Sequence, residues 1–294
     1  MASPLFDAQT IAAHILGIDR MSLRFADDFS PEQQLLFDDY VQRRAAREPL
    51  QHILGTAPFG PLDLKVGPGV FIPRPETEQL ADWAATTALE IARSKAGRVK
   101  IVDFCTGSGA IACYIANVLN EHRVPAEIYA VELSPAAIEY AKANVSMVEK
   151  LARENFGFGY GNGPAEPSAK VVILHGSVDD LGLLEANGVE AHSLDLIVSN
   201  PPYVPEGSAV DEETTHDPHN AVFGGDTGMD LMPALFSQAR RYGRLNSPIR
   251  IEHDDTTGPL MLALAAESGI GSGQIISDWA GKPRFFDGVV SSPD

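Results

Sequence analysis

Basic residues are scarce in this chain of 294 residues, in which 22 lysines and arginines stand against 40 aspartates and glutamates. The formal net charge is −18 at pH 7. Sequence-independent binding to nucleic acid depends on Lys and Arg, so a phosphate backbone is expected to be attracted weakly or not at all. We therefore expect no direct contact with nucleic acid, although the distribution of charge over the surface stays open.

Cysteines and long apolar runs are also few. Cys105 and Cys113 are the only cysteines, and a disulfide between positions so close would close no useful loop, so we expect two small buried side chains. No apolar run is long enough to span a bilayer, and the first residues lack the basic and then apolar layout of a signal peptide. These absences predict a cytoplasmic protein without a membrane partner.

The first part of the chain is predicted to be a small helical domain over residues 1–57. Ser30 and Gln33 have the spacing of a capping box, with Pro31 in the first turn of the helix that follows. An apolar stripe continues this helix, formed by Leu36, Phe37, Tyr40 and Val41. Residues 58–73 then mix apolar side chains with prolines and glycines, which predicts a short hairpin that links two domains.

Residues 74–294 alternate α and β patterns. A helix is expected to begin at Pro75, because proline suits a first helical turn. Short β-branched runs recur between helical segments, at 99–104, 127–133, 170–176, 194–200 and 248–253. The alternation predicts an α/β domain with a doubly wound, Rossmann-like sheet. Two more runs, 274–279 and 284–290, predict an antiparallel pair at its edge, and the stretch 155–168 is expected to be a mobile loop.

A glycine-rich turn closes the first of these strands, where DFCTGSG occupies residues 103–109. In a doubly wound sheet a nucleotide-like ligand binds here, because glycine lets it approach the backbone and the N–H groups of the helix start favour an anionic group. The next strand ends at Glu132, which is suited to accept hydrogen bonds from both hydroxyls of a ribose. Turn and acid together predict a nucleoside cofactor; a plain tight turn and an exposed carboxylate are the alternatives.

The sequence NPPY at 200–203, called the NPPY segment below, follows the fourth strand on the same edge of the sheet. Two successive prolines stiffen the backbone, so the Asn200 side chain and the Pro201 carbonyl present two fixed acceptors. A planar NH2 group fits them, its nitrogen stays open towards a methyl donor, and Tyr203 can stack on it. The pattern predicts methylation of an amide or amine nitrogen, against the alternative of a proline-punctuated loop.

These motifs resemble those of the HemK/PrmC family of release-factor glutamine N5-methyltransferases, and the likeness covers nearly the whole chain. It is carried by QHILGTAPFGPLDLKV (51–66), GVFIPRPETE (69–78), IVDFCTGSGAIA (101–112), AVELSP (130–135), DLIVSNPPYV (195–204) and AVFGGDTGMD (221–230). The NPPY segment alone is shared with adenine-N6 DNA methyltransferases. The PRPE segment behind a helical domain is much more specific to the family.

The resemblance implies a class I methyltransferase sheet, S-adenosylmethionine as cofactor, and a class I peptide release factor that docks on the helical domain. The glutamine of the Gly-Gly-Gln loop would be methylated. Cofactor contacts are expected from Cys105, Thr106, Gly107, Ser108, Gly109, Glu132, Val178 and Asn200. The glutamine amide is expected to lie against Phe71, Asn200, Pro201, Pro202 and Tyr203, of which Asn200, Pro201 and Tyr203 carry the catalysis.

The chain departs from the family pattern at three places. Cys105 stands where the family usually has glycine, Ser177 and Val178 replace an acidic and a bulky residue, and EHDD at 252–255 lacks the usual glycine. These departures bear on cofactor affinity more than on the reaction.

Two other functions fit parts of the sequence. An adenine-N6 methyltransferase would present the same NH2 group after flipping out a base, but it would need a basic groove. A scaffold that keeps the cofactor fold without catalysis is the other alternative, and an intact NPPY segment argues against it. His216 and His219 stand in a loop without further ligands, so we expect solvated histidines there and no metal site.

Overall fold

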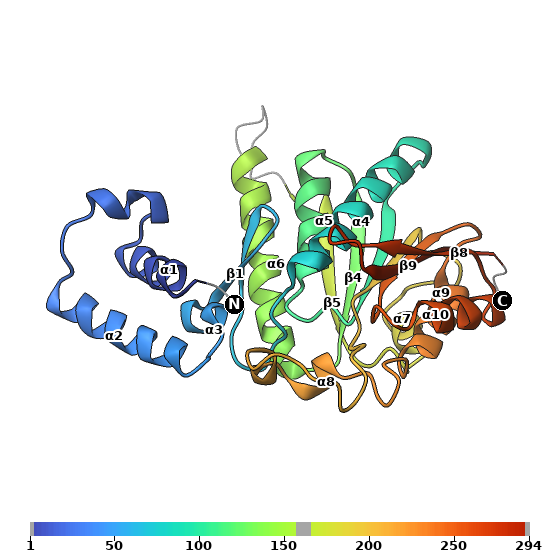
Figure 1. Cartoon of the computed structure of the whole chain (residues 1–294). Coiled ribbons are helices and arrows are strands. Elements are labelled where there is room, and N and C mark those ends of the chain that lie inside the picture. The colour runs from blue at the N-terminus through green and yellow to red at the C-terminus, as the bar shows by residue number, and fades with distance from the viewer. Residues whose placement is uncertain (1–2, 157–165, 292–294) are drawn as a thin grey trace.

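The computed structural model describes residues 3–156 and 166–291. A helical region stands at one end of the molecule, and the C-terminal strands lie at the other (Figure 1). The helical region comprises α1 (Pro4–Leu16), η1 (Arg20–Phe25), α2 (Pro31–Ala45) and α3 (Leu50–Leu54). In the part of the chain that the structure describes, no helix is both long and apolar enough to cross a bilayer.

The predicted capping box holds the start of α2. Ser30 Oγ accepts a hydrogen bond from the Gln33 N–H (3.2 Å), and Gln33 Oε1 accepts one from the Ser30 N–H (2.9 Å). The predicted apolar stripe of this helix does not reach a core, since no residue of α2 is buried and Leu36 stays 41% exposed. Few neighbours cover α2, so the helical region keeps apolar surface open to solvent.

A short hairpin follows the helical region. It pairs β1 (Thr56–Phe59) with β2 (Leu62–Lys65) in antiparallel register, so it begins before the predicted stretch 58–73 and ends well inside it. Phe59, Leu62 and Leu64 point into the main core of the α/β domain. The hairpin is therefore packed as part of that core, and the predicted boundaries between domains stay a prediction.

Seven strands form one sheet in the order β5-β4-β3-β6-β7-β9-β8. The first five are parallel, whereas β9 is antiparallel to both β7 and β8. Their bounds are β3 (Val99–Phe104), β4 (Ala126–Glu132), β5 (Ala169–His175), β6 (Leu196–Ser199), β7 (Pro248–Glu252), β8 (Ile270–Ser277) and β9 (Pro283–Val290). The predicted doubly wound sheet with an antiparallel edge pair is confirmed. Strand β8 begins earlier than its predicted run because it includes Gly271 and Gly273, whose missing side chains leave no strand pattern.

Helices cover both faces of the sheet (Figure 1). Buried side chains of α4 (Pro75–Ser94), α5 (Ala110–Glu121) and α6 (Pro135–Phe156) form the core on one face. Those of α9 (Met232–Tyr242) and α10 (Gly258–Glu267) form it on the other. The loops also hold three short turns, α7 (Leu183–Ala186), η2 (Thr214–His216) and α8 (His219–Val222). Most of the predicted loop at 155–168 lies outside the described residues.

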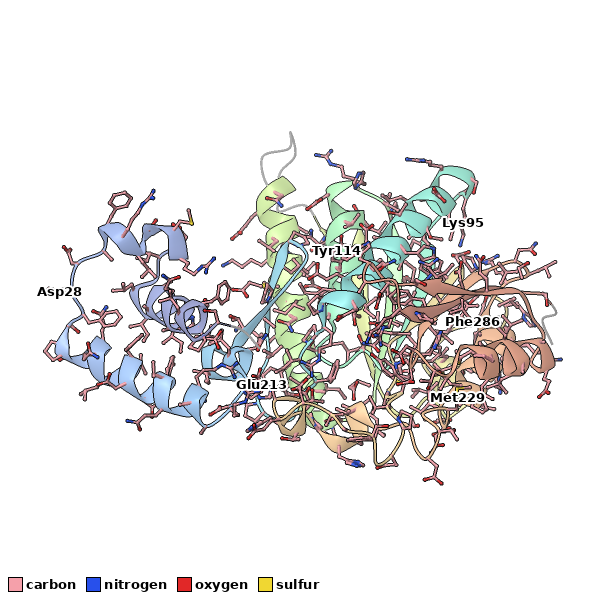
Figure 2. The ribbon with its side chains drawn as sticks, in the orientation of Figure 1. Asp28, Lys95, Tyr114, Glu213, Met229 and Phe286 are labelled. Carbon is pink, nitrogen blue, oxygen red and sulfur yellow. The ribbon has the colours of Figure 1, made fainter. Side chains whose placement is uncertain are left out.

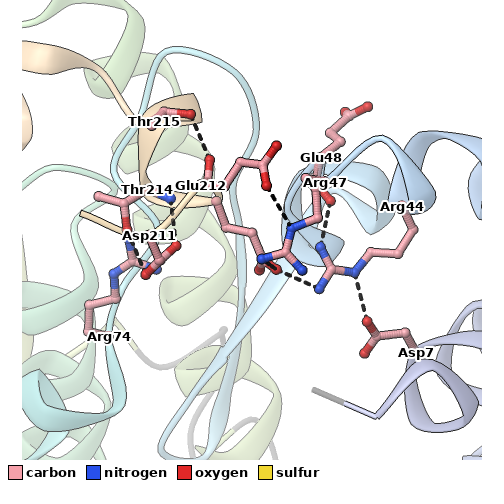
Figure 3. A network of polar contacts seen from close by, with 10 residues as sticks. Asp7, Arg44, Arg47, Glu48, Arg74, Asp211, Glu212, Thr214 and Thr215 are labelled. Atoms are coloured by element: carbon pink, nitrogen blue, oxygen red, sulfur yellow. Dashed lines mark hydrogen bonds and ion pairs between the residues drawn. The ribbon is translucent and has the colours of Figure 1, made fainter. Parts of the chain in front are cut away.

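An arginine at the end of α2 joins the helical region to the α/β domain (Figure 3). Arg44 donates from Nε to Asp7 of α1 (2.7 Å) and from a terminal nitrogen to Glu213 (2.8 Å). A terminal guanidinium nitrogen of Arg47 lies 3.3 Å from the same carboxylate oxygen, Glu213 Oε1. Figure 2 places Glu213 at the boundary of the two regions and Asp28 at the far end of the helical one. The bridge therefore ties α1 and α2 to the loop before η2.

We expect Arg44→Ala to lower the free energy of unfolding by about 3 kcal/mol, because its loss leaves a buried charge uncompensated. That charge is Asp7, which is 6% exposed. The exposed pair of Lys142 and Glu139 provides a control, and Lys142→Ala should leave stability nearly unchanged. Chemical denaturation measures both losses, and equal losses would show that the bridge is no stronger than a surface pair.

Candidate active site

Three parallel strands end at the same edge of the sheet and bring the predicted site residues together. The glycine turn follows β3, Glu132 ends β4, and the NPPY segment follows β6. A cavity of about 310 Å³ opens at this edge. It is lined by most of the predicted cofactor residues: Cys105, Thr106, Gly107, Ser108, Glu132, Val178 and Asn200.

Gly109, which was predicted to contact the cofactor, does not line this cavity. It caps α5 with a φ of +80°, and a Cβ atom there would lie 3.4 Å from the Cβ of Ala141 in α6. Glycine at this position therefore allows α5 and α6 to pack closely against each other. Cys105 has a φ of 58°, in the region that favours glycine, which is a physical reason for the glycine usual at this position. Both cysteines are free; Cys113 is buried as predicted, whereas Cys105 lies in the cavity wall and is only half-buried, contrary to the prediction.

Two carboxylates accept hydrogen bonds from backbone N–H groups around the glycine turn. Glu132 accepts hydrogen bonds from the N–H of Gly107 and the N–H of Ser134, both at 2.8 Å. Asp103, fully buried beneath the turn, accepts a bond from the N–H of Ala112 in α5 (3.1 Å). Burial raises the pKa of Asp103 to about 7. Glu132 therefore occupies the Gly107 N–H that the sequence pattern offered to an anionic group, whereas Asp103 does not line the cavity.

The hydrogen bonds of Glu132 leave it able to bind a ligand in the cavity. Glu132 lines it and keeps lone pairs for hydroxyl groups, because each carboxylate oxygen accepts more than one hydrogen bond. S-adenosylmethionine, which has two ribose hydroxyls and no phosphate, matches this lining. Leu133 and Val178 add apolar wall that suits an adenine ring.

A second cavity, of about 440 Å³, lies on the other side of the NPPY segment. Pro201 and Tyr203 line this second cavity, whereas Pro202 lines the first. Phe71 and Asn200 line both, so they stand where the two spaces meet. A planar group held in the second cavity would reach the first beside Asn200.

Asn200 is held by a hydroxyl in the first turn of α4. Its Nδ2 donates to Thr77 Oγ1 (3.1 Å), which leaves its Oδ1 to accept a hydrogen bond from a substrate. The hydroxyl of Tyr203 donates to Glu252 at the end of β7 (2.8 Å). Sequence reasoning missed Thr77 and Glu252 as site residues. Both stand in segments that it quoted, PRPETE and EHDD, but neither segment shows by itself that it reaches Asn200.

The loop with HDPH at 216–219 lies beside the cavities. Both of its histidines are exposed, whereas Asp217 is buried and binds Arg74 (2.6 Å) and the N–H of Ile72 (3.2 Å). Asp217 thereby fixes the segment that carries Phe71. Among the residues described, no three His, Cys, Asp or Glu side chains are grouped so as to hold a metal ion.

Comparison with known proteins assigns the family. Residues 1–55 match the family model of the PrmC N-terminal domain. The chain is 44% identical to the release factor glutamine methyltransferase of Corynebacterium glutamicum, over 97% of this chain and 91% of that protein. The protein of the same name from Mycolicibacterium smegmatis is 42% identical, over 97% of this chain and 90% of its own. The chain belongs to the release factor glutamine methyltransferase family.

A solved structure agrees on the fold. The hMettl16 catalytic domain in complex with MAT2A 3'UTR hairpin 6 superposes with a TM-score of 0.53, over 92% of this chain and 84% of that one. At 12% identity this likeness shows the fold alone. Together with the family it confirms the predicted class I methyltransferase sheet and the predicted cofactor, S-adenosylmethionine.

Replacing Glu132 with alanine should weaken binding of S-adenosylmethionine about ten- to a hundred-fold, since a hydrogen bond to a charged group contributes about 1.5–3 kcal/mol. Glu127→Ala is the matched control, because Glu127 lies at the other end of the same strand and lines neither cavity. Isothermal titration calorimetry gives both dissociation constants. Unchanged affinity for Glu132→Ala would remove this side chain from the cofactor site.

Proposed function

We propose that this protein transfers a methyl group from S-adenosylmethionine to the side-chain amide nitrogen of the glutamine in the Gly-Gly-Gln loop of a class I peptide release factor. The observation that carries the proposal is the position of Asn200, at the junction of two cavities and with its amide oxygen free to accept a hydrogen bond. The names of the relatives support the substrate. A substrate of this kind also implies action in the cytoplasm.

The NPPY segment prepares the glutamine amide for attack. The Asn200 side-chain oxygen and the Pro201 carbonyl each accept a hydrogen bond from one N–H of this amide. The two bonds fix the plane of the amide and raise the electron density on its nitrogen. Phe71 offers an aromatic face at the junction of the cavities, against which a planar amide can pack. The cofactor supplies a methyl group on positively charged sulfur. An amide nitrogen is a poor nucleophile, so alignment by these residues should provide most of the rate.

Charges around the second cavity favour a protein substrate over nucleic acid. Three aspartates line this cavity, and its two arginines are already paired with buried aspartates. The lining aspartates are Asp211, Asp254 and Asp255, and the pairs are Arg74 with Asp217 and Arg284 with Asp278. A phosphate backbone would meet no unpaired arginine there, so a flipped base is the weaker alternative.

The helical region offers a surface to the release factor. Of the large apolar side chains that are exposed among the described residues, half lie within residues 5–36. They are Leu5, Phe6, Ile18, Met21, Phe25, Leu35 and Leu36. Apolar surface gathered in this way is typical of a protein interaction site. None of these side chains lines either cavity, which supports docking by this region apart from the chemistry.

Asn200→Ala should slow methyl transfer by about 10²–10³, the usual cost of losing one preorganised hydrogen-bonding group in a transition state. Cofactor affinity and melting temperature should change far less, because the lost contact strengthens only as the nitrogen attacks. Single-turnover transfer to a release factor, cofactor titration and a thermal melt measure the three quantities. Asn200→Asp keeps an oxygen but adds a charge, and we expect it to be badly impaired too. A rate within about three-fold of wild type for Asn200→Ala would refute the mechanism.

Phe25→Ser should raise KM for the release factor about five- to ten-fold and leave kcat and cofactor affinity unchanged, because it removes apolar contact area used only in docking. Phe25 is 78% exposed. Trp279→Ser is the matched control, since Trp279 is 74% exposed and lies between β8 and β9, far from the helical region. Steady-state kinetics with varied release factor compare the two variants. Equal KM values would exclude Phe25 from the docking surface.

A further inference from the structure

A chain of hydrogen bonds runs from the end of β7 to the catalytic asparagine. Thr77 Oγ1 donates to Glu252 Oε2 (2.9 Å), and Asn200 Nδ2 donates to Thr77 Oγ1 (3.1 Å). The other carboxylate oxygen, Oε1, accepts a bond from the Tyr203 hydroxyl (2.8 Å). Glu252 thus holds one end of the NPPY segment directly and the other through Thr77. We propose that Thr77 and Glu252 are positioning residues that decide which atom of the Asn200 amide faces the substrate.

The direction of this chain follows from the chemistry of its last member. An ionised carboxylate only accepts hydrogen bonds, so the single hydroxyl proton of Thr77 is committed to Glu252. The oxygen of Thr77 then offers only lone pairs to Asn200, and it can receive the NH2 end of the amide but not the oxygen end. Asn200 Oδ1 is therefore left to face the substrate. Without the relay the amide could turn over and set its own NH2 against the NH2 of the glutamine.

Burial makes the relay a fixed part of the site. Thr77 is 3% exposed and Glu252 is 1% exposed, so solvent does not compete for their hydrogen bonds. Removal from water raises the pKa of Glu252 to about 7, and the bonds from Tyr203 and Thr77 act in the opposite direction. Two more charged groups face it, Arg284 of β9, which lowers the pKa, and Glu76 of α4, which raises it. The buried imidazole of His253 adjoins it in the chain.

Ionisation of Glu252 matters because the protonated acid has a hydrogen to donate. It could then turn the Thr77 hydroxyl toward Asn200 and remove the preference for one end of the amide. The relay is directional above the pKa and is lost as the pH falls through it. This inference rests on the proposed function, since it concerns the glutamine amide, and it predicts an effect on the rate of transfer and not on cofactor binding.

A pair of substitutions at Thr77 tests the relay. Valine keeps the shape of threonine without the hydroxyl, whereas serine keeps the hydroxyl. With cofactor and release factor saturating, Thr77→Val should lower the single-turnover rate about ten-fold or more, and Thr77→Ser should recover most of that loss. Cofactor dissociation constants should stay within about three-fold of wild type in both. Thr86→Val, at an exposed position of the same helix, is the control. Equal rates for the valine and serine variants would overturn the proposal.

Glu252→Gln provides a second, independent readout. The glutamine amide has hydrogens to donate, so it keeps the size of the side chain but destroys the direction of the relay. We expect the wild-type rate to decline as the pH drops below about 7, and the Glu252→Gln profile to be low and flat over the same range. A decline that persists in Glu252→Gln would assign the titration to another group, such as Asp103, and would contradict the relay.

Failure of the proposed function would look different from failure of the relay. A wild-type enzyme that leaves the release-factor glutamine unmethylated, as judged by peptide mass spectrometry, overturns the function and the relay together. An active wild type with indistinguishable valine and serine variants overturns the relay alone. Slow transfer by Thr77→Val, recovery by Thr77→Ser and a flat profile for Glu252→Gln support both.

Discussion

Three carboxylates at the ends of parallel strands organise this site, two of them buried and one, Glu132, in the wall of the first cavity. Asp103 near the end of β3, Glu132 at the end of β4 and Glu252 at the end of β7 each accept hydrogen bonds from a neighbouring loop or helix. Since an ionised carboxylate offers only lone pairs, every such bond fixes the direction of the group that donates it. The glycine turn, the NPPY segment and the first turn of α4 all take their orientation from these three side chains.

Of these three carboxylates only Glu132 lines the first cavity, where it suits a ligand with hydroxyl groups. A dinucleotide-binding turn leaves its N–H groups to a phosphate, whereas here the N–H of Gly107 already belongs to Glu132. The carboxylate faces the cavity in place of the N–H group, ready for hydroxyl groups. This hydrogen bond therefore leaves a carboxylate at a point of the cavity wall where a dinucleotide-binding turn has a free N–H group.

The loop that follows the NPPY segment contacts both the helical region and the residues that line the second cavity. The chain leaves the NPPY segment, meets Arg44 at Glu213, and returns to the cavity junction where Asp217 binds Arg74 and the N–H of Ile72. Phe71 stands next to these contacts and lines both cavities. The apolar surface that we propose for docking is thus tied to the wall of the second cavity by ion pairs.

The sequence by itself determined the elements and the chemistry that depend on neighbours along the chain. A β-branched run predicted strand β3 at residues 99–104, and the spacing of Ser30 and Gln33 predicted the capping box. Both signals depend only on residues that are close together in the sequence. Only the tertiary structure brought Thr77 to Glu252, 175 residues away, and both to Asn200. The same packing lets the Tyr203 hydroxyl donate a hydrogen bond to Glu252. Contacts between distant residues follow from how strands and helices pack, and packing leaves no spacing in the sequence from which they could be predicted.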